Sequence, residues 1–203
     1  MPAPLPPADG CAVVTMELQR GVVGDLATMP ALVDAATRRN VLGACGRLVE
    51  GARSNGVPVL HAQVRWAADR RGTPLNTPLA ASLSRRPEQM LEDTAAVELV
   101  PELGDTTGDL SSWRRHGLTP FVGTDLDPLL RSLGVHTVVA VGVSLNIGVL
   151  GLCLGATDLG YRAVVPTDAV VGVPEEYGDA VLANSVAMVA ALTTVDELLA
   201  AWR

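Results

Sequence analysis

The sequence predicts an α/β domain of Rossmann-like, three-layer α/β/α architecture, built on a mainly parallel sheet of about six strands. Short apolar runs rich in β-branched residues, such as Cys11–Met16 and residues 138–141, alternate with longer stretches of helical periodicity. Strands that alternate with helices form parallel sheets covered on both faces. The length of 203 residues fits one such domain. We therefore expect residues 1–203 to form a single domain, with a proline-rich lead-in over residues 1–10.

The composition is that of an ordinary globular protein, with 48% apolar and 18% charged residues. The net charge of -7 disfavours a nucleic-acid partner. No apolar run is long enough to cross a membrane, and the N-terminus lacks the basic start and apolar segment of a signal peptide. We expect a cytoplasmic homo-oligomer, a dimer or tetramer, that acts on a small molecule and contacts neither nucleic acid nor membrane.

The basic and thiol side chains restrict the available chemistry. All fifteen basic residues are arginine, so lysine chemistry is excluded. Cys11, Cys45 and Cys153 lie in apolar contexts without the spacing of metal ligands. Buried free thiols in a reducing compartment are the expected state of all three.

The first half of the chain predicts two strands and one helix. Cys11–Met16 is a buried strand that ends at the polar residue Glu17. Residues 30–53 carry apolar residues at helical spacing and end at Ser54-Asn55-Gly56, which indicates one helix. Residues 57–64 form a second strand.

Residues 67–110 predict a long loop or lid, because prolines and glycines interrupt every longer pattern. Short helices are expected around residues 79–83 and 88–90. Residues 110–115 predict a short strand, and a helix begins after Thr124 or Asp125 and ends near residue 133.

A strand over residues 138–141, a turn over 143–146 and a helix from Ile147 form the centre of the predicted fold. A strand within residues 160–168, a helix over 175–189, a short strand near 190–194 and helical turns over 196–202 follow. The turn lies at the carboxyl end of a central strand and beside a helix N-terminus, where open α/β sheets bind ligands. Its glycines, among them Gly142 and Gly148, favour either a close-approaching ligand or tight packing of the helix on the sheet.

Four segments resemble the isochorismatase-like hydrolases, a group that includes cysteine amidases such as nicotinamidase. These segments are residues 13–19 (VVTMELQ), 121–127 (FVGTDLD), 142–148 (GVSLNIG) and 158–169 (DLGYRAVVPTDA). The resemblance covers nearly the whole chain. It implies the strand order 3-2-1-4-5-6 and a non-proline cis peptide between Val143 and Ser144.

The family's usual triad of Asp, Lys and Cys falls by position on Glu17, Arg115 and Gly148, so all three positions depart from the pattern. Gly148 supplies no nucleophile, and Cys153 lies five residues further along the helix, on another face. Arg115 stays charged and can only position or stabilise negative charge. By resemblance, isochorismatase itself also has glycine at the nucleophile position and works by acid catalysis from its aspartate.

These residues favour a small-molecule hydrolase or lyase that forms no covalent intermediate. Glu17 would transfer the proton and Arg115 would hold an anionic or carbonyl oxygen. The backbone N–H groups of Ser144 and Gly148 would form an oxyanion-type pocket. Burial favours the protonated form of Glu17 and a neighbouring arginine the ionised form, and the sequence leaves this balance open.

For several other residues the sequence leaves two roles open. Asn146 either binds substrate or fixes the turn, and His116 is expected at the pocket. Trp66, Trp113 and Phe121 are either apolar pocket walls or core residues. His61 and His136 are expected to be structural.

Two other functions stay open. A catalytically silent binding or structural protein on the same fold is favoured by the loss of the whole triad, and an amidase is what similarity alone suggests. We expect no metal and no cofactor, because the cluster of Asp and His residues that the nicotinamidase branch uses for metal is missing near Gln19 and Arg20.

Overall fold

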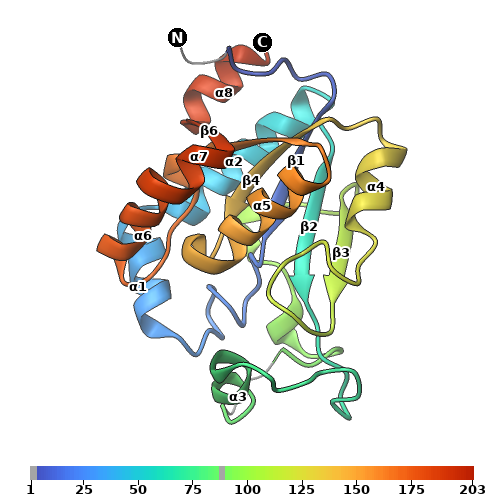
Figure 1. The fold of residues 1–203 in the computed structure, drawn as a ribbon, viewed down its shortest axis with the longest axis vertical. Helices are drawn as coiled ribbons and strands as arrows, with labels where there is room; N and C mark the ends of the chain where they lie inside the picture. Colours follow the sequence, from blue (N-terminus) through green and yellow to red (C-terminus); the bar gives the residue numbers. More distant parts are fainter. Residues whose placement is uncertain (1–3, 87–89) are drawn as a thin grey trace.

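A six-stranded parallel sheet forms the centre of the computed structural model, which describes residues 4–86 and 90–203 (Figure 1). Its strand order is β3-β2-β1-β4-β5-β6, and every neighbouring pair is parallel. The strands are β1 (Cys11–Met16), β2 (Val59–Val64), β3 (Leu110–Arg114), β4 (Thr137–Gly142), β5 (Arg162–Pro166) and β6 (Ala190–Thr193). The predicted strand number, direction and order are confirmed.

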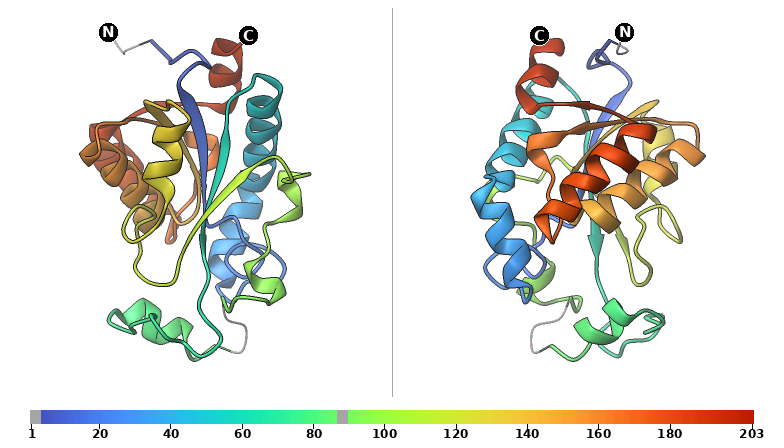
Figure 2. Two further views of the ribbon diagram at one scale, coloured as in Figure 1. Left: turned by 90° about the vertical axis from the view of Figure 1, so that its right-hand side faces the viewer. Right: turned by 60° about the vertical axis from the view of Figure 1, so that its left-hand side comes forward.

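Helices cover both faces of this sheet (Figure 2). One face packs against α1 (Pro30–Arg38), α2 (Val41–Ser54) and α8 (Val195–Ala201). The other face packs against α4 (Leu126–Ser132), α5 (Leu150–Asp158), α6 (Glu175–Val181) and α7 (Ala187–Val189). Alternate residues of β1 serve the two cores, Val13 on the α2 side and Val14 on the α5 side. The three-layer prediction is therefore confirmed.

The predicted single helix over residues 30–53 is wrong, because the structure contains two helices, α1 and α2. The chain turns between them at Asn40, which adopts a left-handed conformation with φ 51°. Asparagine tolerates this conformation better than most residues, and the apolar spacing continues across the break. The periodicity therefore predicted the buried face correctly and missed the interruption.

The second half of the chain also contains π-helical and 3₁₀ turns. The π-helical turn η3 (Leu145–Val149) leads from the central turn into α5, and η5 (Leu182–Val186) joins α6 to α7. Residues 175–189 are thus helical throughout, as predicted. The 3₁₀ turn η4 (Thr167–Ala169) follows β5.

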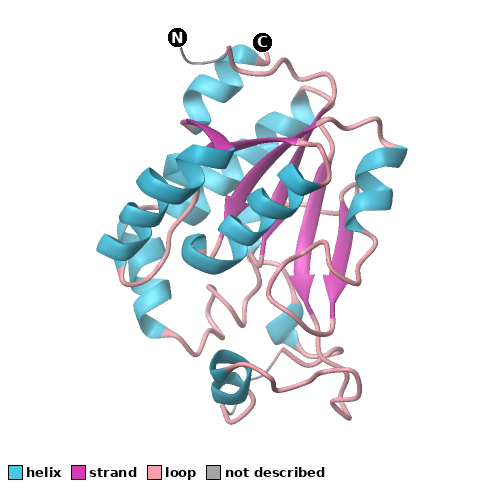
Figure 3. Cartoon of the chain, viewed as in Figure 1, coloured by secondary structure: helices cyan, strands magenta, loops and turns pink. Residues whose placement is uncertain are grey.

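The segment between β2 and β3 contains α3 (Pro78–Leu83), η1 (Ala95–Val97) and η2 (Pro101–Leu103). The predicted helix near residues 79–83 is confirmed, and Thr77 begins it by accepting a hydrogen bond from Ala80 N at 3.0 Å. The helix expected over 88–90 falls largely outside the described residues. Figure 3 shows α3 beyond the arrowheads of β2 and β3, at the carboxyl edge of the sheet.

All three cysteines are free and buried, as predicted. Burial raises the pKa of Cys11 to about 11 and the pKa values of Cys45 and Cys153 to about 12. In the described part of the chain, no helix is long and apolar enough to cross a membrane.

Candidate functional site

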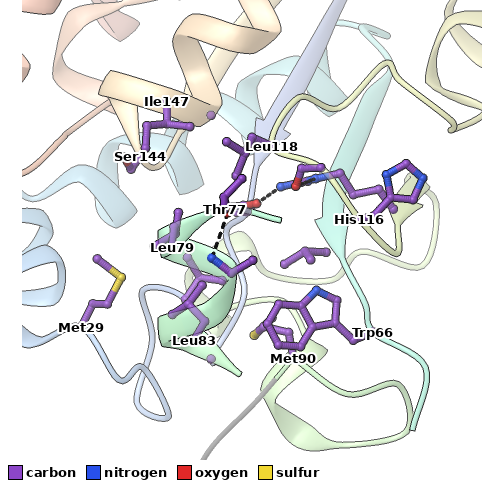
Figure 4. A pocket seen from close by; sticks show the side chains of 18 of the residues that line it. Met29, Trp66, Thr77, Leu79, Leu83, Met90, His116, Leu118, Ser144 and Ile147 are labelled. Carbon is purple, nitrogen blue, oxygen red and sulfur yellow. Dashed lines mark hydrogen bonds and ion pairs between the residues drawn. The ribbon is translucent and has the colours of Figure 1, made fainter. Parts of the chain in front are cut away.

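A cavity of about 290 Å³ opens at the carboxyl edge of the sheet, between the strand ends and the α3 segment (Figure 4). Its polar groups come from the ends of β1, β3 and β4, where Met16 pairs with Gly142 and Val64 with Arg114. Parallel strands bring these three ends to one edge, although Glu17 and Arg114 are 97 residues apart in the chain. This edge is where open α/β sheets bind ligands, as the sequence predicts.

Glu17 lies directly after β1 and lines this cavity. Its backbone is left-handed, with φ 51°, and its N–H donates to Ala62 O at 2.9 Å. A non-glycine residue pays a conformational cost of about 1 kcal/mol or more in this region, and such residues cluster at functional sites. The carboxylate side chain is 18% exposed, so it is accessible from the cavity.

The fully buried Gln19 fixes the chain just after Glu17. Its Nε2 donates to Val64 O at 3.1 Å and to Val97 O at 3.0 Å, while its Oε1 accepts from Val64 N at 2.9 Å. The amide thereby links β1, β2 and η1. We infer that this linkage holds Glu17 in its unusual conformation.

Arg114 is the ionic partner of Glu17: its Nη2 donates to Glu17 Oε1, and its side chain is 4% exposed. The predicted pairing of Glu17 with Arg115 is therefore wrong. Side chains alternate along β3, so Ser112 and Arg114 are buried while Trp113 and Arg115 lie on the exposed side. Counting from the family pattern reached the neighbouring arginine, one residue away.

The outward-facing side chains form a separate group. Arg115 is bonded to Glu92 at 3.3 Å and lies over the Trp113 ring at 5.5 Å, and Arg65 lies 5.9 Å from the same ring. Trp113 is 40% exposed and is not part of the cavity wall. The expectation that Arg115 contributes to the pocket is therefore wrong. Trp113 has neither of the two roles left open for it, pocket wall or core residue, for the same reason of strand alternation.

Phe121 also lies outside the cavity wall. Its ring stacks on Tyr161 with centroids 6.3 Å apart and packs against α5, where a Cβ on Gly155 would approach it to 2.7 Å. The core role that the sequence left open for this residue is the one that the structure shows. Trp66 and His116, in contrast, line the cavity, with Trp66 buried and His116 exposed at its rim.

The turn after β4 brings Ser144, Asn146 and Gly148 to the same wall. Ser144 Oγ donates to Asn146 Oδ1 at 2.5 Å, and Asn146 Nδ2 lies 3.5 Å from Val173 O. Asn146 therefore fixes the turn and also faces the cavity. Gly142 has φ 108°, and a Cβ there would be 2.4 Å from Met16 O, so only glycine fits. The Val143–Ser144 peptide is cis, as the resemblance implied.

The position of the missing nucleophile is closely packed. A Cβ on Gly148 would lie 3.0 Å from Met16 Cε and 3.1 Å from Val143 O. The nearest thiol in the following helix, Cys153, is fully buried in the core with a raised pKa. No group of three or more His, Cys, Asp or Glu that could hold a metal occurs among the described residues.

The remaining wall is mainly apolar, and most of it was not predicted. Its large apolar side chains include Met29, Trp66, Leu79, Leu83 and Met90 (Figure 4), together with Leu32. Thr28, Thr73, Asn76 and Thr77 add uncharged polar groups. These residues come from the segment before α1, from α1, from the end of β2 and from the long segment around α3. The spacing of Leu79 and Leu83, one helical turn apart after a Thr-Pro start, was a usable signal for an apolar helix face.

Comparison with known proteins agrees with this geometry. The family model described as the isochorismatase domain matches residues 11–197. A protein of Escherichia coli O157:H7, the uncharacterized isochorismatase family protein YecD, is 30% identical over 191 residues, which are 93% of this chain and 94% of that one. The chain belongs to the isochorismatase family.

The chain is also similar to proteins whose names state an activity and to further solved structures. The ureidoacrylate amidohydrolase RutB of Serratia proteamaculans is 30% identical over 149 residues, 67% of this chain and 59% of that one. An isochorismatase family protein of Burkholderia thailandensis superposes with a TM-score of 0.79 at 24% identity, over 98% of both chains. The N-carbamoylsarcosine amidase of Thermoplasma acidophilum gives a TM-score of 0.70 at 23% identity, over 92% of this chain and 96% of that one. These structures share the isochorismatase-like fold with our chain.

Proposed function

We propose that this isochorismatase-family protein is a small-molecule hydrolase or lyase that works without a covalent intermediate. The observation that carries the proposal is the Glu17–Arg114 ion pair in the wall of the cavity. A carboxylate accessible to substrate is a competent proton-transfer group, and Gly148 offers no competing nucleophile.

The Glu17 carboxyl group is paired with the Arg114 guanidinium and lines the cavity, so it is placed to exchange a proton with a bound molecule. In the proposed reaction Glu17 would act first as a base. In a hydrolysis it would take a proton from water as the water oxygen bonds to a carbonyl carbon. The carbon–nitrogen or carbon–oxygen bond would then break, and the leaving group would receive that proton. Arg114 would stabilise the negative charge that develops on the carbonyl oxygen.

The test is turnover of a panel of amide, ester and vinyl-ether substrates by the wild type and by Glu17→Gln. We expect Glu17→Gln to lower kcat by about 10² to 10⁴-fold on any substrate that the wild type converts, which is the usual contribution of a positioned acid or base. Glu92→Gln is the matched control, because Glu92 pairs with Arg115 outside the cavity, and it should retain the wild-type rate. A Glu17→Gln rate equal to that of the wild type would contradict the proposal.

The buried cysteines give a second control. Because all three thiols are buried with raised pKa values, treatment with iodoacetamide should leave the activity unchanged. Loss of activity that follows the alkylation of one cysteine would point to a covalent route instead.

A catalytically silent binding protein is the second candidate. It is favoured by two observations: Glu17 and Arg114 neutralise each other, and a Cβ at the position of the nucleophile would lie only 3.0 Å from Met16 Cε. Under this alternative, ligands would bind in the cavity and the wild type would convert no member of the panel.

A further inference from the structure

We infer that the cavity selects an uncharged carbonyl compound with an apolar body, such as an aromatic or branched aliphatic amide or ester. This inference rests on the proposed function for its reaction, and its own content is the charge and polarity of the substrate.

The positive charge of Arg114 and the negative charge of Glu17 cancel in the wall of the cavity. Among the described residues that line it, the ionisable ones are Glu17, Arg114 and His116. Glu17 and Arg114 are paired with each other. A carboxylate ligand beside Arg114 would therefore also lie beside Glu17, and the repulsion would offset the attraction.

Arg114 nevertheless has a donor to offer. Its Nη2 is bonded to Glu17 and its Nε lies 3.3 Å from Gly117 O, but its buried Nη1 has no hydrogen-bond acceptor among the described residues. A buried donor without an acceptor costs about 1–3 kcal/mol. Because Arg114 lines the cavity, a neutral carbonyl oxygen that reaches this donor would satisfy it without adding a second negative charge next to Glu17. Carbonyl recognition thus fits the pair better than anion recognition does.

Most of the remaining surface of the cavity is apolar. Met29, Leu32, Leu79, Leu83 and Met90 form one side, and Trp66 adds an aromatic face. The other polar lining residues are uncharged: Thr28, Thr73, Asn76, Thr77, Ser144 and Asn146. A volume of about 290 Å³ lies at the lower end of the range of small-molecule pockets. A second charged group on the substrate would have to be buried on this surface without a partner of opposite charge, which is unfavourable.

The experiment measures the affinities of benzamide, benzoate and phthalate by isothermal titration calorimetry at pH 8, above the range in which histidine commonly titrates. These probes share an aromatic ring and differ in charge from zero to two. For the wild type we expect benzamide to bind about tenfold or more tightly than benzoate, and phthalate to give no measurable heat. Benzoate binding as tightly as benzamide, or measurable phthalate binding, would overturn the inference.

The variant Glu17→Gln makes the test specific to the ion pair. It leaves Arg114 without its anion, so the preference should reverse and benzoate should bind about tenfold more tightly than benzamide. An unchanged preference in Glu17→Gln would also overturn the inference.

The variant Leu79→Arg tests the apolar wall without touching the ion pair. Leu79 is half-buried, so an arginine can be accommodated, and we expect the variant to bind phthalate. Leu75→Arg is the matched control, since Leu75 is 49% exposed outside the cavity wall and should leave phthalate unbound. Phthalate binding by both arginine variants or by neither would contradict the assigned role of the wall.

These binding measurements are independent of turnover. A protein that binds benzamide selectively but converts no substrate would retain this inference and lose the proposed reaction. A protein that converts amides but binds benzoate more tightly than benzamide would retain the proposed reaction and lose this inference.

Discussion

The choice between Arg114 and Arg115 shows how much depends on one residue. Both are arginines next to each other at the end of β3, and both form an ion pair, Arg114 with Glu17 and Arg115 with Glu92. Arg114 is 4% exposed, whereas the side chain of Arg115 is 46% exposed. Exposed ion pairs contribute little to stability, while removal of one partner of a buried pair leaves an uncompensated charge.

We therefore expect Arg114→Gln to lower the free energy of unfolding by about 3 kcal/mol, and Arg115→Gln to change it by about 0.5 kcal/mol or less. Urea denaturation of the two variants measures both values, and each variant is the matched control for the other. Equal losses in the two variants would contradict the assignment of Arg114 as the buried partner of Glu17.

At the scale of elements, the break between α1 and α2 depends on a single backbone conformation. Asn40 is exposed and left-handed, with φ 51°, and its side chain makes no capping hydrogen bond to α2. Any effect of a substitution at this position therefore comes mainly from the backbone.

Asn40→Ala should cost about 1 kcal/mol of stability, because a Cβ without a compensating polar group disfavours the left-handed region. Asn40→Gly should lie within about 0.5 kcal/mol of the wild type, because glycine adopts this region readily but is more flexible when unfolded. Thermal unfolding of both variants tests the difference. An alanine variant as stable as the glycine variant would mean that the turn is held by other contacts.

The long segment with α3 is the element that completes the cavity. It is attached to the sheet by a few bonds, among them Thr73 Oγ1 to Arg115 O at 2.9 Å and Trp66 N to Met90 O at 2.6 Å. None of the residues of α3 is fully buried. The segment therefore contributes to the site mainly through the partly buried side chains of Leu79 and Leu83, and less through packing of its own.

At the scale of the whole molecule, a buried polar chain crosses one face of the sheet. Thr15 Oγ1 lies 2.8 Å from His61 Nδ1, and His61 Nε2 lies 2.9 Å from Asp109 Oδ2. Arg53 of α2 in turn donates to both oxygens of Asp109. This chain joins β1, β2, the start of β3 and α2, and it is separate from the cavity wall.

Burial lowers the pKa of His61, and its hydrogen bond to Asp109 opposes this shift only in part. The unfolded state then binds a proton more readily than the folded state below the ordinary histidine pKa of about 6.5. The free energy of unfolding should therefore fall as the pH drops below about 6.5, by at most about 1.4 kcal/mol per pH unit from this group.

Urea denaturation at pH 7.5, 6.5 and 5.5 measures this dependence. His61→Gln retains polar atoms at the position but cannot take up a proton in this range, so its stability should vary less with pH than that of the wild type. Identical pH profiles for the two proteins would exclude His61 as the source.

Local features of the sequence determined most of the fold. Alternation of apolar runs and helical periods fixed six parallel strands and two helical layers, because each strand and helix must bury its own apolar face. The position of Glu17 at the end of β1 and the turn after β4 followed from strand ends and residue identity. The absence of a nucleophile at Gly148 followed from the resemblance to the isochorismatase-like hydrolases. His116 was also expected at the cavity because it follows the end of a strand, whereas Trp66 was left open between the cavity wall and the core.

Tertiary structure decided what depends on side-chain direction and on contacts between distant segments. The sequence did not specify which face of the edge strand β3 is buried, and that face determines that Arg114, rather than Arg115, meets Glu17. The sequence left open whether Phe121 lines the cavity or packs in the core, and its stacking on Tyr161 in the folded protein decides for the core. The apolar wall joins residues from before α1, from α1 itself and from the α3 segment, which are brought together only when the chain folds, so no local pattern contains it.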